Sequence, residues 1–275
     1  MVSSDGLSGV TITSKTNPLV KDLAGLRRSA GRRRHEGVTL VEGFKILELA
    51  LDAGNRPIAV LHDDSSTVAD DRRVLDRARQ MGATIRPVTT DVLAKVSARE
   101  GPMGCVASVH LAEWPLSRIE LGSPPLLLVV EGLEKPGNLG ALARTASAAG
   151  ADALVAADSQ TDIFSPATVH ASLGSVFQLP VVRCTSAEAL DYLEAKGIEV
   201  VATSPDADKA YFELDLARPV AIAVGNEHRG LSESWLGAGQ RALIPMSGPM
   251  NSLNATTAGG IVLFEAVRQR HSARA

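Results

Sequence analysis

Five consecutive apolar residues, Leu126 to Val130, are followed by a segment rich in Gly, Pro and Asn and then by a helical stretch from Gly140 to Ala149. A strand that is apolar on both faces needs cover on both faces, as in the parallel sheets of α/β proteins. The alternation continues, with strands expected at 153–156, 179–182, 199–202, 220–224 and 242–244 and helices at 187–196 and 256–270. The second half is therefore predicted to be an α/β domain with a mostly parallel sheet.

The first half shows a separate alternation of short elements. Helices are expected at 19–28, 46–53 and 72–81, strands at 39–41, 58–62 and 84–87, and an Arg-rich loop after the first helix. Residues 111–125 contain four Pro or Gly residues and little periodicity, which is typical of a linker. We therefore expect an N-terminal α/β domain over 1–110, a linker over 111–125 and a second domain over 126–275.

Composition excludes several classes of protein. Two cysteines, Cys105 and Cys184, are too few for a disulfide framework or a cysteine-based zinc site, and the six histidines show no H-x-x-x-H pair. No window approaches the roughly 20 apolar residues of a membrane helix, and the N-terminus lacks the apolar region of a signal peptide. Aromatic residues make up only 3%, which argues against a base-stacking platform. The sequence indicates a cytoplasmic protein without a metal site or a membrane contact.

Three loops, each placed after an expected strand, carry most of the residues that could hold a ligand. They span 131–144, 225–231 and 244–254. In parallel α/β sheets, ligands bind in loops beyond the carboxyl ends of the strands. The glycines allow a ligand to approach the main chain, whose N–H and C=O groups can read an adenine edge, and apolar walls would come from Ile244, Met246 and Leu253. A P-loop, a dinucleotide fingerprint and a nucleophile elbow are all missing.

The three loops match the motifs of a known family. The pattern N-x-G-x-x-x-R at Asn138, Gly140 and Arg144 resembles the first motif of the SpoU/TrmH RNA 2′-O-ribose methyltransferases. The segments G-N-E-x-x-G-L at 225–231 and I-P-M-x-G-x-x-x-S-L-N at 244–254 resemble the second and third. Upstream segments at 17–21, 41–43 and 101–104 are similar to the family's N-terminal substrate-binding domain. The sequence departs from the family where Lys135 replaces a common Asp and where Ala255-Thr256 replaces Val-Ala or Val-Ser.

This resemblance implies a fold, a cofactor and a substrate. Members have an α/β catalytic domain with a deep trefoil knot that binds S-adenosylmethionine (SAM), an L30e-like N-terminal α/β domain, and a homodimeric assembly whose sites combine loops of both subunits. The N-terminal domain and the C-terminal helix are most similar to rRNA-directed members, so 23S rRNA is the expected substrate. Members of the avilamycin-resistance type protect antibiotic producers in this way. The alternatives are a tRNA 2′-O-methyltransferase and a noncatalytic RNA-binding or ribosome-assembly factor.

The family motifs also assign residues by position. The catalytic set implied by the resemblance is Asn138, Arg144, Glu227, Ser252 and Asn254. The cofactor-binding set comprises Thr203, Ser204, Gly225, Asn226, Ile244, Met246, Ser252 and Leu253.

The 2′-hydroxyl is a poor nucleophile near neutral pH, so its proton must be removed or shared. Arg144 is the family's usual candidate for that task, but a guanidinium keeps its proton to a pKa above about 12. We therefore expect Arg144 to grip a substrate phosphate and orient the ribose. The proton then leaves through Glu227, water or a concerted path. For Glu227 the alternative is a structural role, in which the carboxylate holds its loop through main-chain N–H groups.

The mild net charge of −3 hides a local basic cluster in the first half of the chain. Because clustered cations bind phosphates, this region is expected to supply affinity for RNA, with a solvated surface as the alternative. The residues concerned are Lys15, Lys21, Arg27, Arg28, Arg32, Arg33, Arg34 and Lys45.

Overall fold

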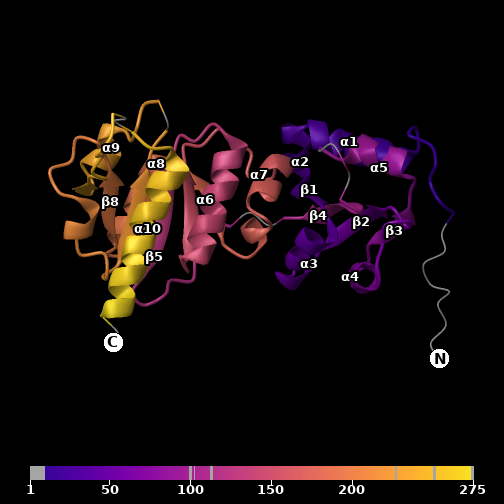
Figure 1. Cartoon of the computed structure of the whole chain (residues 1–275), viewed down its shortest axis with the longest axis horizontal. Coiled ribbons are helices and arrows are strands. Elements are labelled where there is room, and N and C mark those ends of the chain that lie inside the picture. The colour runs from indigo at the N-terminus through magenta and orange to yellow at the C-terminus, as the bar shows by residue number, and fades with distance from the viewer. Residues whose placement is uncertain are drawn as a thin grey trace. The chain divides into compact units, whose positions relative to one another are not determined.

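The computed structural model describes residues 10–98, 101, 103–111, 114–226, 228–249 and 252–273, and it divides into two compact units (Figure 1). Unit 1 contains the described residues of 10–111 together with Phe164–Gln178. Unit 2 contains those of 114–163 and 179–273. The sequence analysis placed the whole of 126–275 in one domain, and the structure differs in assigning Phe164–Gln178 to unit 1.

Unit 1 has a four-stranded sheet in the order β1-β4-β2-β3. The strands are β1 (Val38–Glu42), β2 (Pro57–His62), β3 (Thr84–Pro87) and β4 (Cys105–His110). Strand β4 is antiparallel to both β1 and β2, and β3 is parallel to β2. The fold is thus α/β as expected, but the sequence analysis missed β4, which lies inside the sheet.

Helices cover both faces of this sheet. On one face, α1 (Pro18–Arg28) packs beside α5 (Thr90–Val96), and on the other lie α3 (Phe44–Asp52) and α4 (Ala69–Gln80) (Figure 1). The Arg-rich stretch forms helix α2 (Ala30–Glu36), so its prediction as a loop was wrong. Ser29 caps its start by accepting a bond from the Arg32 amide, and Gly37 ends it at φ +60°. These end residues make a short polar helix possible.

The segment Phe164–Gln178 packs on unit 1 through specific contacts. It contains α7 (Pro166–Ala171) and a 3₁₀ turn, η2 (Ser175–Phe177). Thr39 of β1 donates a side-chain hydrogen bond to the Phe164 carbonyl over 2.7 Å. A Cβ placed on Gly174 would lie 3.0 Å from the Leu49 side chain and 3.3 Å from that of Ile46. Gly174, at φ +88°, therefore permits a close approach to α3.

Unit 2 has a six-stranded sheet in which every pairing is parallel, in the order β10-β8-β9-β5-β6-β7. This confirms the predicted parallel α/β domain. The strand expected at 242–244 ends earlier than predicted, so the third loop begins at residue 243. The strands are β5 (Leu126–Glu131), β6 (Ala153–Ala157), β7 (Val181–Cys184), β8 (Glu199–Thr203), β9 (Val220–Val224) and β10 (Gly239–Ala242).

Alternate side chains of the central strands face two helical layers. On one face α8 (Ser186–Ala195) and α9 (Glu233–Leu236) bury Trp235 against Leu127 and Val129. On the other, α6 (Pro136–Ala148) packs beside α10 (Ala255–Ser272) (Figure 1). Gly259 of α10 sits where a Cβ would lie 2.9 Å from Leu142 of α6. The missing side chain at Gly259 therefore allows α10 to approach α6 closely.

Candidate functional site

The three predicted loops meet at one edge of the unit 2 sheet. Strands β10, β8, β9 and β5 are neighbours and parallel, so their carboxyl ends lie side by side. The segments that leave these ends begin at residues 243, 204, 225 and 132. Carboxyl ends of parallel strands are the usual place for ligands in such sheets. The arrangement brings together segments that are about a hundred residues apart in sequence.

The loop after β9 is a tight turn stabilised by its own main chain. The amide of Gly230 donates to the carbonyl of Asn226 over 2.9 Å, and the amide of Asn226 donates back over 3.2 Å. A Cβ on Gly225 would lie 2.1 Å from the carbonyl carbon of Gly230 and 2.4 Å from the amide nitrogen of Leu231. Since real contacts are never so short, position 225 admits only glycine in this conformation.

The Asn226 side chain joins this loop to the segment after β5. Its Nδ2 donates to the carbonyl of Gly132 over 2.9 Å and to Oε1 of Glu134 over 3.2 Å. Its Oδ1 accepts from the amides of His228 and Arg229 at 2.8 and 3.3 Å. All polar atoms of the amide are thus engaged, and Asn226 sets the loop's shape rather than projecting toward a ligand. Glu227, the candidate proton acceptor, lies outside the described residues.

Thr203 and Ser204 hold strand ends. The Thr203 hydroxyl donates to the carbonyl of Ala223 in β9 over 3.0 Å. The Ser204 amide donates to the carbonyl of Ala242, where β10 ends, over 3.0 Å, and its hydroxyl accepts from the Asp206 amide. These contacts place both residues at the predicted edge and tie three strands together there.

The third loop leaves large apolar side chains exposed at this polar edge. Met246 is 38% exposed and Leu253 is 39% exposed, while Ile244 is half-buried and Ser252 exposed. A ligand that covered these side chains would gain roughly 25 cal/mol of binding free energy for each Å² of apolar surface removed from water. Met250 and Asn251 lie outside the described residues.

Asn254 begins the C-terminal helix. Its Oδ1 accepts from the Thr256 amide over 2.8 Å and also from the Thr256 hydroxyl, so it is the N-cap of α10. The hydroxyl bond gives a local role to Thr256, one of the residues that departs from the family pattern. Capping fixes where the third loop ends.

The first motif is divided between the start and the middle of α6. Asn138 lies half-buried in the first turn, at the sheet edge. Arg144 is exposed and lies eight residues beyond Pro136, about 12 Å along the helix at 1.5 Å per residue. Within the described part of the chain, the side chain of Arg144 makes no hydrogen bond or ion pair. Within a single chain, Arg144 therefore lies away from the sheet edge where the three loops meet.

Three side chains that the sequence analysis did not select also shape the edge. Glu131 accepts hydrogen bonds from Ser232, just after the β9 loop. Ser159 and Thr161, after β6, both donate to the Leu133 carbonyl, at 3.1 and 2.6 Å. The sequence indicates these residues only by their position, because each lies at or shortly after the carboxyl end of a buried strand.

The basic cluster of unit 1 is only partly available to RNA. Arg33 is 5% exposed and donates to the carbonyls of Leu26 and Arg27, so its prediction as an RNA contact is corrected to a structural role. Arg27 donates to the Ser97 carbonyl. Arg32 forms ion pairs with Asp22 and Glu36, and their hydrogen bonds raise its pKa. These three side chains have partners within the protein.

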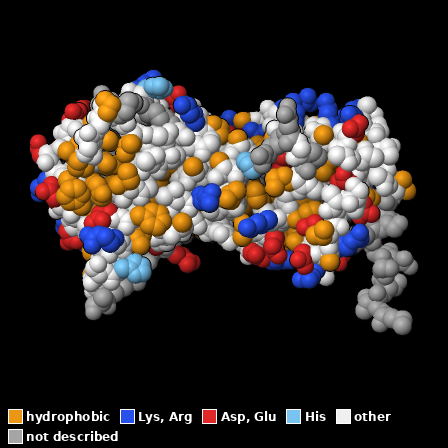
Figure 2. All heavy atoms as spheres, in the orientation of Figure 1, with side chains coloured by type: hydrophobic (Ala, Val, Ile, Leu, Met, Phe, Trp, Pro, Cys, Tyr) orange, Lys and Arg blue, Asp and Glu red, His pale blue; other side chains and the backbone are white. Residues whose placement is uncertain are grey.

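Of the five remaining basic residues, four are exposed without an ion pair to any described residue and one is ion-paired. Arg28, Arg34, Lys21 and Lys45 are exposed, and Lys15 lies 3.6 Å from Asp91. Figure 2 shows Lys and Arg side chains gathered over α1 and α2 of unit 1. A basic surface therefore persists, carried by fewer arginines than the sequence suggests.

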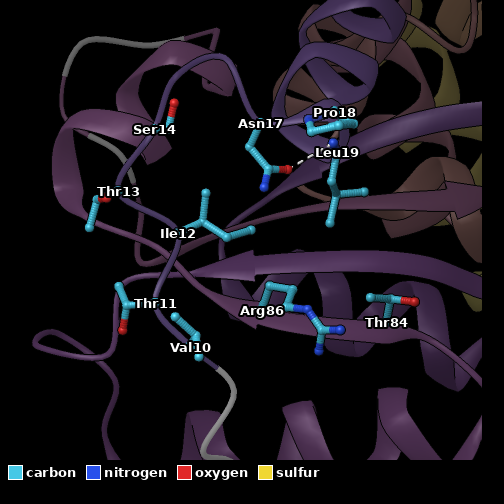
Figure 3. Close-up of a pocket in the computed structure, with 10 residues that line it drawn as sticks. All are labelled: Val10, Thr11, Ile12, Thr13, Ser14, Asn17, Pro18, Leu19, Thr84 and Arg86. Atoms are coloured by element: carbon cyan, nitrogen blue, oxygen red, sulfur yellow. Dashed lines mark hydrogen bonds between the residues drawn. The ribbon is translucent and has the colours of Figure 1, made fainter.

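A separate hollow of about 670 Å³ lies in unit 1 (Figure 3). The extended segment 10–14 runs beside β3, pairing through Ile12 with Val88, and forms one wall with the start of α1. Thr84 and the exposed Arg86 form the other wall. None of its lining residues belongs to the three loops.

The two cysteines do not offer reactive thiols. Burial raises the pKa of Cys105 far above its usual range and that of Cys184 to about 11. No group of three or more metal-ligating side chains occurs among the described residues, and no helix among them is long and apolar enough to cross a membrane.

The exposed arginines give a direct prediction for RNA binding. Replacing Arg28 and Arg34 together by Gln should lower the slope of log affinity against log salt by about 1.4, because each phosphate contact with single-stranded RNA contributes roughly 0.7. The affinity for SAM should stay the same. Filter binding between 50 and 200 mM salt measures the slope.

The matched control replaces Arg72 and Arg73 of α4, two exposed arginines on the other face of the unit 1 sheet, by Gln. This pair should leave the slope unchanged. Equal slopes for the two double variants would show that α1 and α2 do not contact RNA phosphates.

Together, the parallel sheet with its glycine-rich carboxyl edge and the separate basic unit define a two-unit α/β protein, with a candidate ligand-binding edge in one unit and a basic surface in the other. Comparison with known proteins gives the family. Residues 125–264 match the model of the SpoU rRNA methylase family, and residues 17–107 match the MRM3-like substrate binding domain. The chain belongs to the SpoU rRNA methylase family.

Individual relatives agree along nearly the whole chain. The 23S rRNA (uridine(2479)-2′-O)-methyltransferase of Streptomyces viridochromogenes is 33% identical, over 96% of this chain and 93% of the relative. The SpoU methyltransferase AviRb of the same organism, solved with the cofactor AdoMet (SAM), superposes with a TM-score of 0.85 at 32% identity, covering 93% of this chain and 99% of that one. An AdoMet-bound rRNA methyltransferase from Sinorhizobium meliloti gives 0.86 at 32% identity, covering 94% and 97%.

Proposed function

We propose that this protein transfers the methyl group of SAM to a ribose 2′-hydroxyl of RNA, with 23S rRNA as the substrate. The observation that carries the proposal is the meeting of the three motif loops at one sheet edge in a member of the SpoU rRNA methylase family. Relatives that match nearly the whole chain are named as 23S rRNA 2′-O-methyltransferases or were solved with AdoMet. A cytoplasmic location follows from such a substrate.

The edge has the donors and surfaces that SAM requires. The main chain at Gly225 and Asn226 is half-buried at this edge, and Ile244, Met246 and Leu253 offer apolar surface for an adenine ring. We assign adenine recognition to main-chain groups of the second and third loops, and contacts to the ribose or methionine part to Ser252 and Asn254. SAM supplies an electrophilic methyl group, so the protein's work is alignment and proton removal.

Arg144 is assigned to the phosphate of the target nucleotide. Its guanidinium cannot accept the proton of the 2′-hydroxyl near neutral pH, but it can hold a phosphate through two parallel hydrogen bonds. Asn138, at the start of the same helix, would orient the reacting groups at the edge. The proton leaves through Glu227, water or a concerted path.

A homodimer fits the separation of Arg144 from the edge of its own chain. In a dimer, Arg144 of one subunit would act at the loops of the other. The deep trefoil knot and the L30e-like form of the N-terminal domain are part of the same proposal, on family grounds.

A tritium-transfer assay tests the proposal and its alternatives. Purified protein is incubated with [methyl-³H]SAM and either 23S rRNA or bulk tRNA. We expect label in 23S rRNA only. Label in tRNA alone would indicate the tRNA enzyme, and RNA binding without any transfer would indicate a noncatalytic assembly factor.

A further inference from the structure

The carboxylate of Glu131 connects the end of β5 to the end of the β9 loop. Its Oε2 accepts from the Ser232 amide over 2.7 Å, and its Oε1 accepts from the Ser232 hydroxyl over 2.6 Å. Ser232 directly follows the second motif, 225–231, and lies 101 residues from Glu131. Two bonds from one carboxylate fix both the position and the orientation of this residue.

The other end of the same loop is fixed to the same segment. Asn226 donates to the carbonyl of Gly132 and to the side chain of Glu134, as described above. Residues 131–134 therefore hold the second motif at both ends. The turn between them is closed by the pair of main-chain bonds between Asn226 and Gly230.

A second layer supports the Glu131 carboxylate. The Ser186 hydroxyl, at the start of α8, lies 3.4 Å from Glu131 Oε1 and accepts from Nε1 of Trp235 over 2.9 Å. Trp235 is fully buried in the core of unit 2. The carboxylate is thus tied to the rigid part of the domain, which makes it a firm attachment point for the loop.

The Ser232 hydroxyl serves this connection rather than the helix it precedes. Ser232 occupies the N-cap position of α9, yet its side chain accepts no capping bond there. Its hydroxyl instead bonds Glu131 and lies 2.8 Å from the hydroxyl of Ser234. An N-cap serine usually accepts from its own helix. In this protein the Ser232 hydroxyl makes no capping bond and instead donates to Glu131 at the end of β5.

We propose that Glu131 is a positioning residue for SAM binding: by holding Ser232, it keeps the 225–231 loop in the shape that receives the cofactor. This inference rests on the proposed function. Glu131 itself touches no reacting atom. Removing its carboxylate would free one end of the loop, whereas an amide of the same shape would still connect to Ser232.

The test compares Glu131→Ala with a matched variant, Glu188→Ala. Glu188 Oε2 accepts from the amide and the hydroxyl of Thr185, the N-cap of α8, both at 2.8 Å, so it makes two bonds of the same kind to a residue outside the three loops. We expect Glu131→Ala to raise the Kd for SAM at least 10-fold by calorimetry, and Glu188→Ala to change it less than twofold. Equal Kd values for the two variants would overturn the proposal.

Glu131→Gln separates positioning from chemistry. Its amide oxygen can accept from the Ser232 amide while its NH₂ donates to the Ser232 hydroxyl. We expect a Kd for SAM and a kcat within about threefold of the wild type. A loss as large as that of Glu131→Ala would contradict a positioning role.

Two further measurements keep the outcomes distinct. If Glu131→Ala fails to fold, Ser232→Ala removes only the hydroxyl bond, and we expect a rise of about threefold in the Kd for SAM; an unchanged Kd overturns the inference. A wild-type protein that binds SAM but methylates no RNA would contradict the proposed function, while the effect of Glu131→Ala on SAM binding could still be measured. A wild-type protein that binds no SAM would end both.

Discussion

Gly225→Ala is expected to abolish measurable SAM binding and to lower the free energy of unfolding by about 3 kcal/mol, the upper part of the range for overpacked sites. A methyl group at this position would lie 2.1 Å from the Gly230 carbonyl carbon and 2.3 Å from its oxygen. Both atoms belong to the main chain, so the turn itself must open to make room. Calorimetry with SAM and urea denaturation measure the two effects.

The matched control is Gly248→Ala in the third loop, where a Cβ would meet nothing within 4 Å. That variant should unfold at nearly the same urea concentration as the wild type. If Gly225→Ala instead bound SAM with wild-type affinity, the described turn would not be the cofactor-binding conformation.

Arg144→Lys is expected to lower kcat/KM for RNA about 100-fold, or about 2.7 kcal/mol of transition-state stabilisation, with an unchanged Kd for SAM. Lysine keeps the positive charge but loses the planar fork that holds a phosphate through two bonds. Arg144 is exposed on α6 and lies away from the cofactor loops of its own chain. The loss should therefore appear in the RNA-dependent parameters.

Arg183→Lys on β7, another exposed arginine of unit 2, should leave both kcat and KM unchanged. Near-normal turnover of Arg144→Lys would show that charge alone is sufficient and that bidentate positioning is wrong. A weaker affinity for SAM in the same variant would instead place Arg144 at the cofactor.

The parallel sheet and its loops could be predicted because the signals are local. A run such as Leu126–Val130 reads as a strand buried on both faces, and Gly, Pro and Asn directly after it mark a loop. Once the strands are parallel, their carboxyl ends must share one edge. The placement of the three motif loops on one edge then follows from the sequence, whereas their closeness depends on the strand order β10-β8-β9-β5, which is set by long-range pairing.

The features that were missed depend on contacts between distant residues. The Arg-rich stretch has the polarity of a loop, but Ser29 and Gly37 cap it as a helix. Arg33 in this helix is buried and donates hydrogen bonds to main-chain carbonyls. Phe164–Gln178 joins unit 1 through Thr39 and Gly174, contacts with no periodic pattern in the sequence. The bonds of Glu131 to Ser232 span 101 residues and are equally invisible locally.

The position of the transferred methyl group tests the central claim most directly. RNA labelled with [methyl-³H]SAM is hydrolysed in alkali, which cleaves beside a free 2′-hydroxyl but cannot cleave where that oxygen carries a methyl group. We expect the label in alkali-resistant dinucleotides from 23S rRNA. Label in mononucleotides, which would place the methyl group on a base, or no label in RNA at all, would contradict the assignment of this chain as a ribose 2′-O-methyltransferase.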